Sequence, residues 1–165
     1  MKNPFSRPAK FWPTLGFAAL AGSRATGAPA FLSQYLSKQT INPALLGSPL
    51  RWLAKPAVTT GLELLMAAEV VGDKLPKTPN RIVPQQLGAR VASGALVGAT
   101  LYKAKGGNAW AGALVGGLGT AAATYATFWL RKQATEKLHV DSALTGAAED
   151  ALVLAGGMAL SKAVS

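Results

Sequence analysis

Apolar residues along this chain fall in long runs separated by short polar stretches, and the longest run covers residues 107–130 without a charge. A helix needs ~20 apolar residues to cross a hydrocarbon core, so this run is long enough. Trp110 and Trp129 bracket it about 28 Å apart at the helical rise, and indole rings favour the membrane interface. The run therefore predicts a transmembrane helix.

Other apolar runs predict further spans near residues 11–36, 56–75, 84–102 and 142–164. Arg24 and Pro29 interrupt the first of these runs and argue against a secretory signal, so we expect a retained and kinked helix there. The sequence thus predicts an all-α fold. It is a polytopic transmembrane helical bundle of about five spans, within a range of four to six, in a single integral membrane domain over residues 1–165.

The segment between the first two predicted spans, residues 41–56, is too short and too rich in Pro and Gly to cross a bilayer. We expect it to be re-entrant or interfacial, with Trp52 at the level of the lipid headgroups. All four tryptophans are predicted to anchor the protein at the membrane interface: Trp12, Trp52, Trp110 and Trp129.

The composition agrees with a membrane location and excludes several chemistries. Only 15% of the residues are charged, against roughly 25% in average soluble domains. The lack of cysteine and the single histidine, His139, exclude a disulfide scaffold, a thiol nucleophile and a Cys- or His-rich metal site. The sequence also lacks a nucleophile elbow and a phosphate-binding loop. We therefore predict no enzyme activity, no catalytic residue, no metal and no cofactor.

The net charge of +10 would suit nucleic acid if the protein were soluble. Here the basic residues cluster between the apolar runs, where they would meet anionic headgroups. We therefore predict the lipid bilayer as a partner and no nucleic acid. With five spans, a cytoplasmic N-terminus places nine Lys and Arg inside and six outside, and that bias favours this orientation.

Acidic residues are scarce, yet several lie inside apolar runs, where an isolated charge costs at least a few kcal/mol. Glu69 and Asp73 are four residues apart and share a helix face, while Arg24 and Arg90 interrupt otherwise uncharged runs and need acidic partners. We predict an intramembrane charge network of Arg24, Glu69, Asp73, Arg90, Glu149 and Asp150. The alternative is that Asp73, Glu149 and Asp150 lie near helix ends, where the interface tolerates charge.

Glycines spaced by four residues predict close contacts between helices. Gly94 and Gly98 form one G-x-x-x-G pair, and Gly112 and Gly116 form another. Small residues let helix backbones approach each other in a bilayer, either within one chain or between copies in a homo-oligomer. A Gly- and Ala-rich helix also produces this short motif by chance. Tight packing within the monomer is our first expectation.

The stretch EVVGDKLPKTP, residues 69–79, resembles an uncharacterised bacterial family, a domain-of-unknown-function group of small inner-membrane proteins. The family motif E-x-x-x-D-K-[IL]-P corresponds here to Glu69, Asp73, Lys74, Leu75 and Pro76. The stretches NRIVPQQLGARVASGALVGA and GAAEDALVLAG are similar to the family as well. The resemblance implies a multi-pass protein of the bacterial inner (cytoplasmic) membrane and supplies no activity.

Two functional hypotheses from different classes follow. In the first, the protein is a non-catalytic structural or accessory subunit that packs through small-residue helix faces into a homo-oligomer or a larger membrane complex. In the second, it is a small ion- or proton-coupled transporter or channel that uses the same charges as its pathway. We favour the first, because 165 residues are few for alternating access without oligomerisation.

Overall fold

The structure, a computed structural model, describes residues 8–39, 42–72, 82–137 and 142–164. These residues form helices with no strand among them, so the all-α class is confirmed for this part of the chain. The elements are α1 Pro8–Ser23, α2 Gly27–Ser37, α3 Pro43–Leu46, the 3-10 helix η1 Pro49–Ala54, α4 Pro56–Gly72, α5 Pro84–Ala104, α6 Ala109–Lys137 and α7 Ser142–Ala163.

The four longer runs downstream of residue 55 each form one helix, α4 to α7. Pro56 and Pro84 begin α4 and α5, where a missing backbone N–H costs nothing. Within the described residues, length and composition qualify one helix to cross a membrane, Ala109–Glu136. Only 22% of its apolar window is buried, so its surface is mostly outward-facing.

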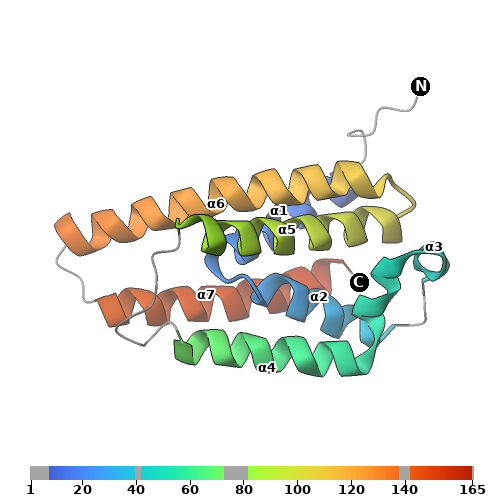
Figure 1. The fold of residues 1–165 in the computed structure, drawn as a ribbon, viewed down its shortest axis with the longest axis horizontal. Helices are drawn as coiled ribbons and strands as arrows, with labels where there is room; N and C mark the ends of the chain where they lie inside the picture. Colours follow the sequence, from blue (N-terminus) through green and yellow to red (C-terminus); the bar gives the residue numbers. More distant parts are fainter. Residues whose placement is uncertain (1–7, 40–41, 73–81, 138–141, 165) are drawn as a thin grey trace.

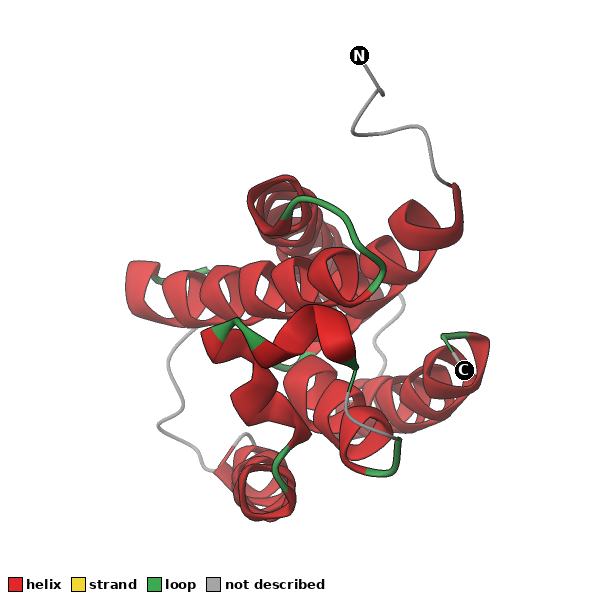
Figure 2. Cartoon of the chain, turned by 90° about the vertical axis from the view of Figure 1, so that its right-hand side faces the viewer, coloured by secondary structure: helices red, strands yellow, loops and turns green. Residues whose placement is uncertain are grey.

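The helices lie side by side in a bundle whose edges are formed by α6 and α4, with α1, α5, α2 and α7 between them (Figure 1). Figure 2 looks along the bundle from the end where α5 and α7 finish and α6 begins. We call this the α3 end, since α3 and η1 lie there. The closest pairing is α5 against α6, and α1 packs on both.

The predicted span 11–36 is two helices, α1 and α2, that run in opposite directions. The contacts with α7 show the reversal. Along α7, the contacting residues of α2 increase in residue number, so α2 runs parallel to α7, while those of α1 decrease, so α1 runs antiparallel to it. In order along α7 these contacts are Gly27 with Val153, Leu20 with Gly156, Phe31 with Gly157, Gly16 with Leu160, and Tyr35 with Val164. Residues 24–26 form the apex of this α1–α2 hairpin. The expectation of one kinked helix was therefore wrong.

Because of the reversal, the start of α1 and the end of α2 both lie at the α3 end. Tyr35, near the end of α2, donates a 2.7 Å hydrogen bond from its hydroxyl to the carbonyl of Val164 at the end of α7. Asn42, just beyond α2, donates from Nδ2 to the carbonyl of Ala104 at 3.0 Å. Lys10, in α1, lies beside Gly107 at the turn between α5 and α6.

The interior of the bundle has an apolar core that includes Phe17, Leu32 and Val97, and it also holds hydroxyl-bearing and charged side chains. Many other large apolar side chains lie on the outside. The buried polar residues include Thr14, Arg24, Ser33, Thr59, Arg90, Thr100, Thr120 and Thr124. Exposed large apolar residues include Leu64, Leu65, Leu114, Leu118, Leu152, Leu154 and Met158. A folded protein in water rarely exposes so many large apolar side chains.

The four predicted packing glycines meet one another within the chain. A Cβ on Gly98 would lie 2.1 Å from the carbonyl oxygen of Gly112, and one on Gly116 would lie 2.1 Å from that of Gly94. Both G-x-x-x-G pairs thus lie in the contact between α5 and α6 of one chain. A homo-oligomer would therefore have to form through a different surface.

Residues 43–54, in the segment expected to be re-entrant or interfacial, fold into α3 and η1. Asn42 and Ser48 cap them, accepting hydrogen bonds from the backbone N–H of Ala44 and Leu50. Both elements are short, and they lie at the α3 end of the bundle (Figure 1).

Candidate functional site

The apex of the α1–α2 hairpin is the most polar part of the interior. Reversing a helix in the middle of a bundle frees backbone carbonyls at the end of one helix and N–H groups at the start of the next. Within α1, the ladder continues up to the N–H of Arg24, which donates to Leu20 at 2.8 Å. In α2 it begins with the N–H of Ala30, which donates to Thr26 at 3.1 Å. The backbone N–H and C=O groups between these two bonds need hydrogen-bond partners from other parts of the chain.

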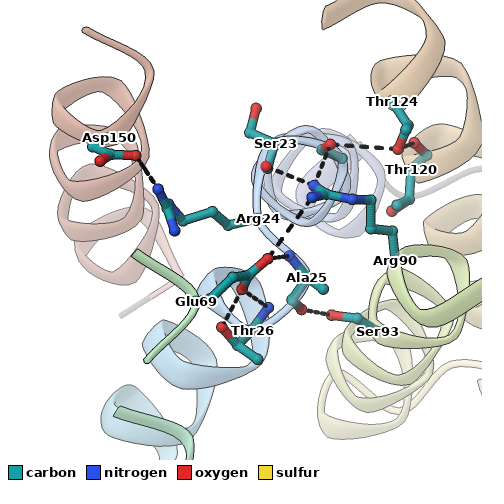
Figure 3. Close-up of polar contacts among 11 residues, drawn as sticks. Ser23, Arg24, Ala25, Thr26, Glu69, Arg90, Ser93, Thr120, Thr124 and Asp150 are labelled. Carbon is teal, nitrogen blue, oxygen red and sulfur yellow. Dashed lines mark hydrogen bonds and ion pairs between the residues drawn. The ribbon is translucent and has the colours of Figure 1, made fainter. Parts of the chain in front are cut away.

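Glu69 of α4 caps the start of α2. Its carboxylate accepts hydrogen bonds from the backbone N–H groups of Ala25 and Thr26, each at 3.0 Å, and from the hydroxyl of Thr26 (Figure 3). Thr26 itself makes no side-chain cap. A carboxylate at the start of a helix also interacts favourably with the positive end of the helix dipole. Glu69 thus takes the role of the N-cap residue for α2, although it lies on another helix.

Arg90 of α5 caps the end of α1 with the opposite charge. Its Nη1 donates to the carbonyls of Gly22 at 2.9 Å and Ser23 at 2.6 Å. A cation at this position complements the negative end of the helix dipole. Its Nη2 lies 3.8 Å from Glu69 Oε1, so the two capping charges also face each other (Figure 3). Arg90 is only 1% exposed.

Arg24 points away from this pair, toward α7. Its Nε donates to Asp150 Oδ1 at 3.1 Å, and its Nη2 forms a second contact with the same oxygen. Figure 3 shows Asp150 and Arg90 on opposite sides of the apex, with Glu69 below it. The apex is therefore fixed to α4, α5 and α7 by charged groups.

Hydroxyl groups of α5 and α6 complete the contacts around the apex. Ser93 donates to the carbonyl of Ala25, Thr120 donates to Ala18 at 3.1 Å, and Thr124 donates to Gly22 at 3.4 Å. Sequence reasoning missed these residues. For Thr120 and Thr124 the signal was their spacing of four residues within the apolar part of α6, which places both on one face.

The remaining residues of the predicted network have different surroundings. Asp73 lies outside the described residues, as do the Lys, Leu and Pro that follow it in the motif. Glu149 precedes Asp150 on α7 and is partly exposed. The four tryptophans lie on the surface, between 55% and 82% exposed.

The charged groups at the apex hold backbone groups and one another in place. The described residues contain no cluster of three or more His, Cys, Asp or Glu that would hold a metal ion. Glu69 already accepts three hydrogen bonds, and Arg90 donates to two carbonyls. We call Arg24, Glu69, Arg90 and Asp150 the clasp, because together they hold the apex of the α1–α2 hairpin.

The fold and the clasp define a class: an all-helical protein built around an internal helical hairpin whose apex is held by buried charges. The chain belongs to the family described as Domain of unknown function (DUF4126), which matches residues 13–163. This confirms the expected membership of an uncharacterised domain family. Comparisons with curated proteins and with solved structures gave no match.

Proposed function

We propose that this chain is a multi-pass protein of the bacterial inner membrane, in which α4 to α7 cross the bilayer and the α1–α2 hairpin enters from one side and returns to it. The large apolar side chains on the outside of the bundle support this proposal. At 1.5 Å per residue, α2 is only about 17 Å long, too short to cross a core of about 30 Å. Irregular backbone is tolerated at membrane depth only where protein surrounds it, and α4, α5 and α7 surround the apex.

The hairpin changes the expected distribution of charge across the membrane. It brings Lys38, Arg51, Lys55, Lys103, Lys105 and Lys162 to the side of Lys10, whereas five single spans would have separated them from it. The far end carries Arg131 and Lys132 among the residues whose side chains are described. The excess of described basic residues at the α3 end supports a cytoplasmic α3 end and a cytoplasmic N-terminus.

Single cysteines in this cysteine-free chain test the hairpin and the orientation together. We expect Ser6→Cys, which precedes α1 in the chain, and Lys38→Cys, which follows α2, to react with a membrane-impermeant maleimide only after spheroplasts are opened. Lys132→Cys, at the far end, should react in intact spheroplasts. Labelling of positions 6 and 38 from opposite sides would exclude the hairpin, and labelling of all three from one side would exclude the bundle of spans.

We further propose that the protein is a non-catalytic structural or accessory subunit, in a homo-oligomer or a larger membrane complex. The observation that carries this proposal is Glu63, which is exposed in the middle of α4. Its Oε1 accepts a hydrogen bond from Gln34 Nε2 at 3.3 Å on the exposed surface. An ionisable group facing lipid at this depth is costly, so we propose that another protein surface covers it. Since α4 packs mainly on α2 and η1, its outer face is free for such a contact.

Extraction in a mild detergent, followed by native mass measurement and identification of co-purified proteins, tests this proposal. We expect wild type to run as an assembly and Glu63→Ala to shift at least tenfold toward the monomer. Glu136→Ala, an exposed glutamate on α6 paired with Lys132 at 4.0 Å, should leave the assembly intact. A wild-type monomer without partners would contradict the subunit proposal.

The alternative function is an ion- or proton-coupled transporter or channel. It is favoured by the apex, where two half-helix ends face charged side chains at depth, as in transporters with broken helices. Flux through reconstituted vesicles separates the two functions. Transport predicts that Glu69→Gln folds but no longer conducts, whereas the subunit function predicts no flux in wild type.

A further inference from the structure

A second feature lies at the α3 end of the bundle, away from the hairpin apex. It is a cavity of ≈ 610 Å³ between the end of α2, α3, η1, the end of α5 and the end of α7. This volume lies within the range of small-molecule sites, about 300–1,000 Å³. Its deeper wall is apolar and includes Leu32, Leu36, Leu45, Leu101, Ala104 and Val164.

Basic side chains line the same cavity. Arg51 and Lys55 reach it from η1, and Lys105 reaches it from the end of α5. The described lining contains no acidic residue, so the charge of this wall is positive. Arg51 and Lys55 are exposed, and Lys55 Nζ lies 3.9 Å from the centre of the Trp52 ring. A tryptophan held against a lysine at the end of a bundle is typical of the headgroup region.

Hydrogen bonds within the fold involve several polar groups of the wall, including Arg51, whose Nη1 donates to the carbonyl of Leu46 at 3.4 Å. The Tyr35 hydroxyl donates to the carbonyl of Val164, and the Asn42 amide donates to that of Ala104. These bonds hold α2, α5 and α7 around the apolar part of the cavity. What the cavity offers a ligand is therefore an apolar chamber and a cationic rim.

We propose that this cavity binds the phosphate group and one hydrocarbon chain of an anionic amphiphile. The chain would fill the apolar chamber, and the phosphate would lie at Arg51, Lys55 and Lys105. A guanidinium binds two phosphate oxygens at once, and lysines add point charge. The inference rests on the proposed membrane location only for the source of the ligand, a lipid of the cytoplasmic leaflet, since the chemistry itself can be measured in micelles.

Native mass spectrometry of the full chain, released from maltoside micelles, tests the assignment with three probes. Dodecyl phosphate carries both chain and charge, dodecylphosphocholine carries the same chain with a neutralised headgroup, and inorganic phosphate has no chain. We expect one molecule of dodecyl phosphate to bind at least tenfold more tightly than either other probe. Equal binding of dodecylphosphocholine would overturn the role of the cations. Equal binding of inorganic phosphate would show a site for free phosphate and overturn the role of the chamber.

Two sets of variants locate the binding. The triple change Arg51→Gln, Lys55→Gln and Lys105→Gln should weaken dodecyl phosphate binding at least tenfold. The matched triple Lys38→Gln, Lys103→Gln and Lys162→Gln removes the same charge from the α3 end outside the cavity, and should change binding less than twofold. Equal losses in both triples would overturn the proposal, because binding would then follow net charge.

A third variant tests the apolar chamber without changing charge. Ala54→Trp places a large ring in the cavity from η1, and it should abolish binding of dodecyl phosphate. Melting temperatures without ligand show that each variant is folded. Tight binding to folded Ala54→Trp would overturn the site. If all these tests failed, the cavity proposal would be wrong. The proposed function would still be judged separately, by the maleimide labelling and by the native mass of the assembly.

Discussion

Replacing Glu69 with alanine is expected to open the hairpin apex and to lower the stability of the protein by about 3–5 kcal/mol, the usual cost of removing one partner of a buried ion pair. The loss has two physical parts. The N–H groups of Ala25 and Thr26 lose the acceptor that caps α2. Arg90 loses the carboxylate it faces and remains buried with its charge.

The melting temperature of the purified protein in mild detergent, followed by tryptophan fluorescence, measures this change. Glu69→Gln keeps an oxygen acceptor and the size of the side chain but loses the charge, so its melting temperature should fall between those of wild type and Glu69→Ala. Glu136→Ala is the control, since Glu136 lies on the exposed side of α6. A Glu69→Ala protein that melts like the control would mean that the clasp does not hold the hairpin.

The position of the clasp could be anticipated in part from sequence. Charges inside apolar runs identified Arg24, Glu69, Arg90 and Asp150 as residues that needed partners. The structure brings Arg24 to Asp150 and Arg90 to Glu69. Sequence spacing gave no means to choose which arginine would face which acid, because that choice depends on how helices far apart in the chain pack together.

The hairpin itself was not predicted, and the reason is physical. Residues 24–26 contain neither a proline nor a glycine, and Thr26 gives α2 no side-chain cap. The caps come from Glu69 and Arg90, more than 40 residues away, so the side chains that end α1 and begin α2 are not in the local sequence. The local clues were Gly22, Gly27 and Pro29. Pro29 lies in the first turn of α2, where proline is well tolerated, and it was interpreted as a kink.

The downstream helices were predictable because each is a long, mostly apolar run with no internal proline, begun by proline or a polar loop. Span assignment is harder. Arg90 lowers the hydropathy of α5, and Glu149 and Asp150 lower that of α7, although Arg90 points into the bundle. Average hydropathy cannot distinguish a charge that faces the interior from one that faces outward. Among the described helices, length and composition therefore qualify α6 alone.

The contact between α5 and α6 leads to the second large expected effect. Gly98→Ala should lower stability by about 3 kcal/mol, at the upper end of the cost of overpacking. Its new Cβ would lie 2.1 Å from the carbonyl oxygen of Gly112 and 3.1 Å from the Cα of Gly116. Both are backbone atoms, so no side chain can turn aside and the helices must separate.

The same α5 helix provides a matched control. Gly88 has no atom within 4 Å of the position its Cβ would take. Gly88→Ala should therefore be neutral or raise stability by about 0.5–1 kcal/mol, because alanine favours helix. Gly112→Ala should reproduce the loss seen in Gly98→Ala, because its Cβ would meet the carbonyl oxygen of Gly98 at 2.2 Å. Equal melting temperatures for Gly98→Ala and Gly88→Ala would show that α5 and α6 do not touch at these glycines. The pair would then be free to contact another copy of the chain.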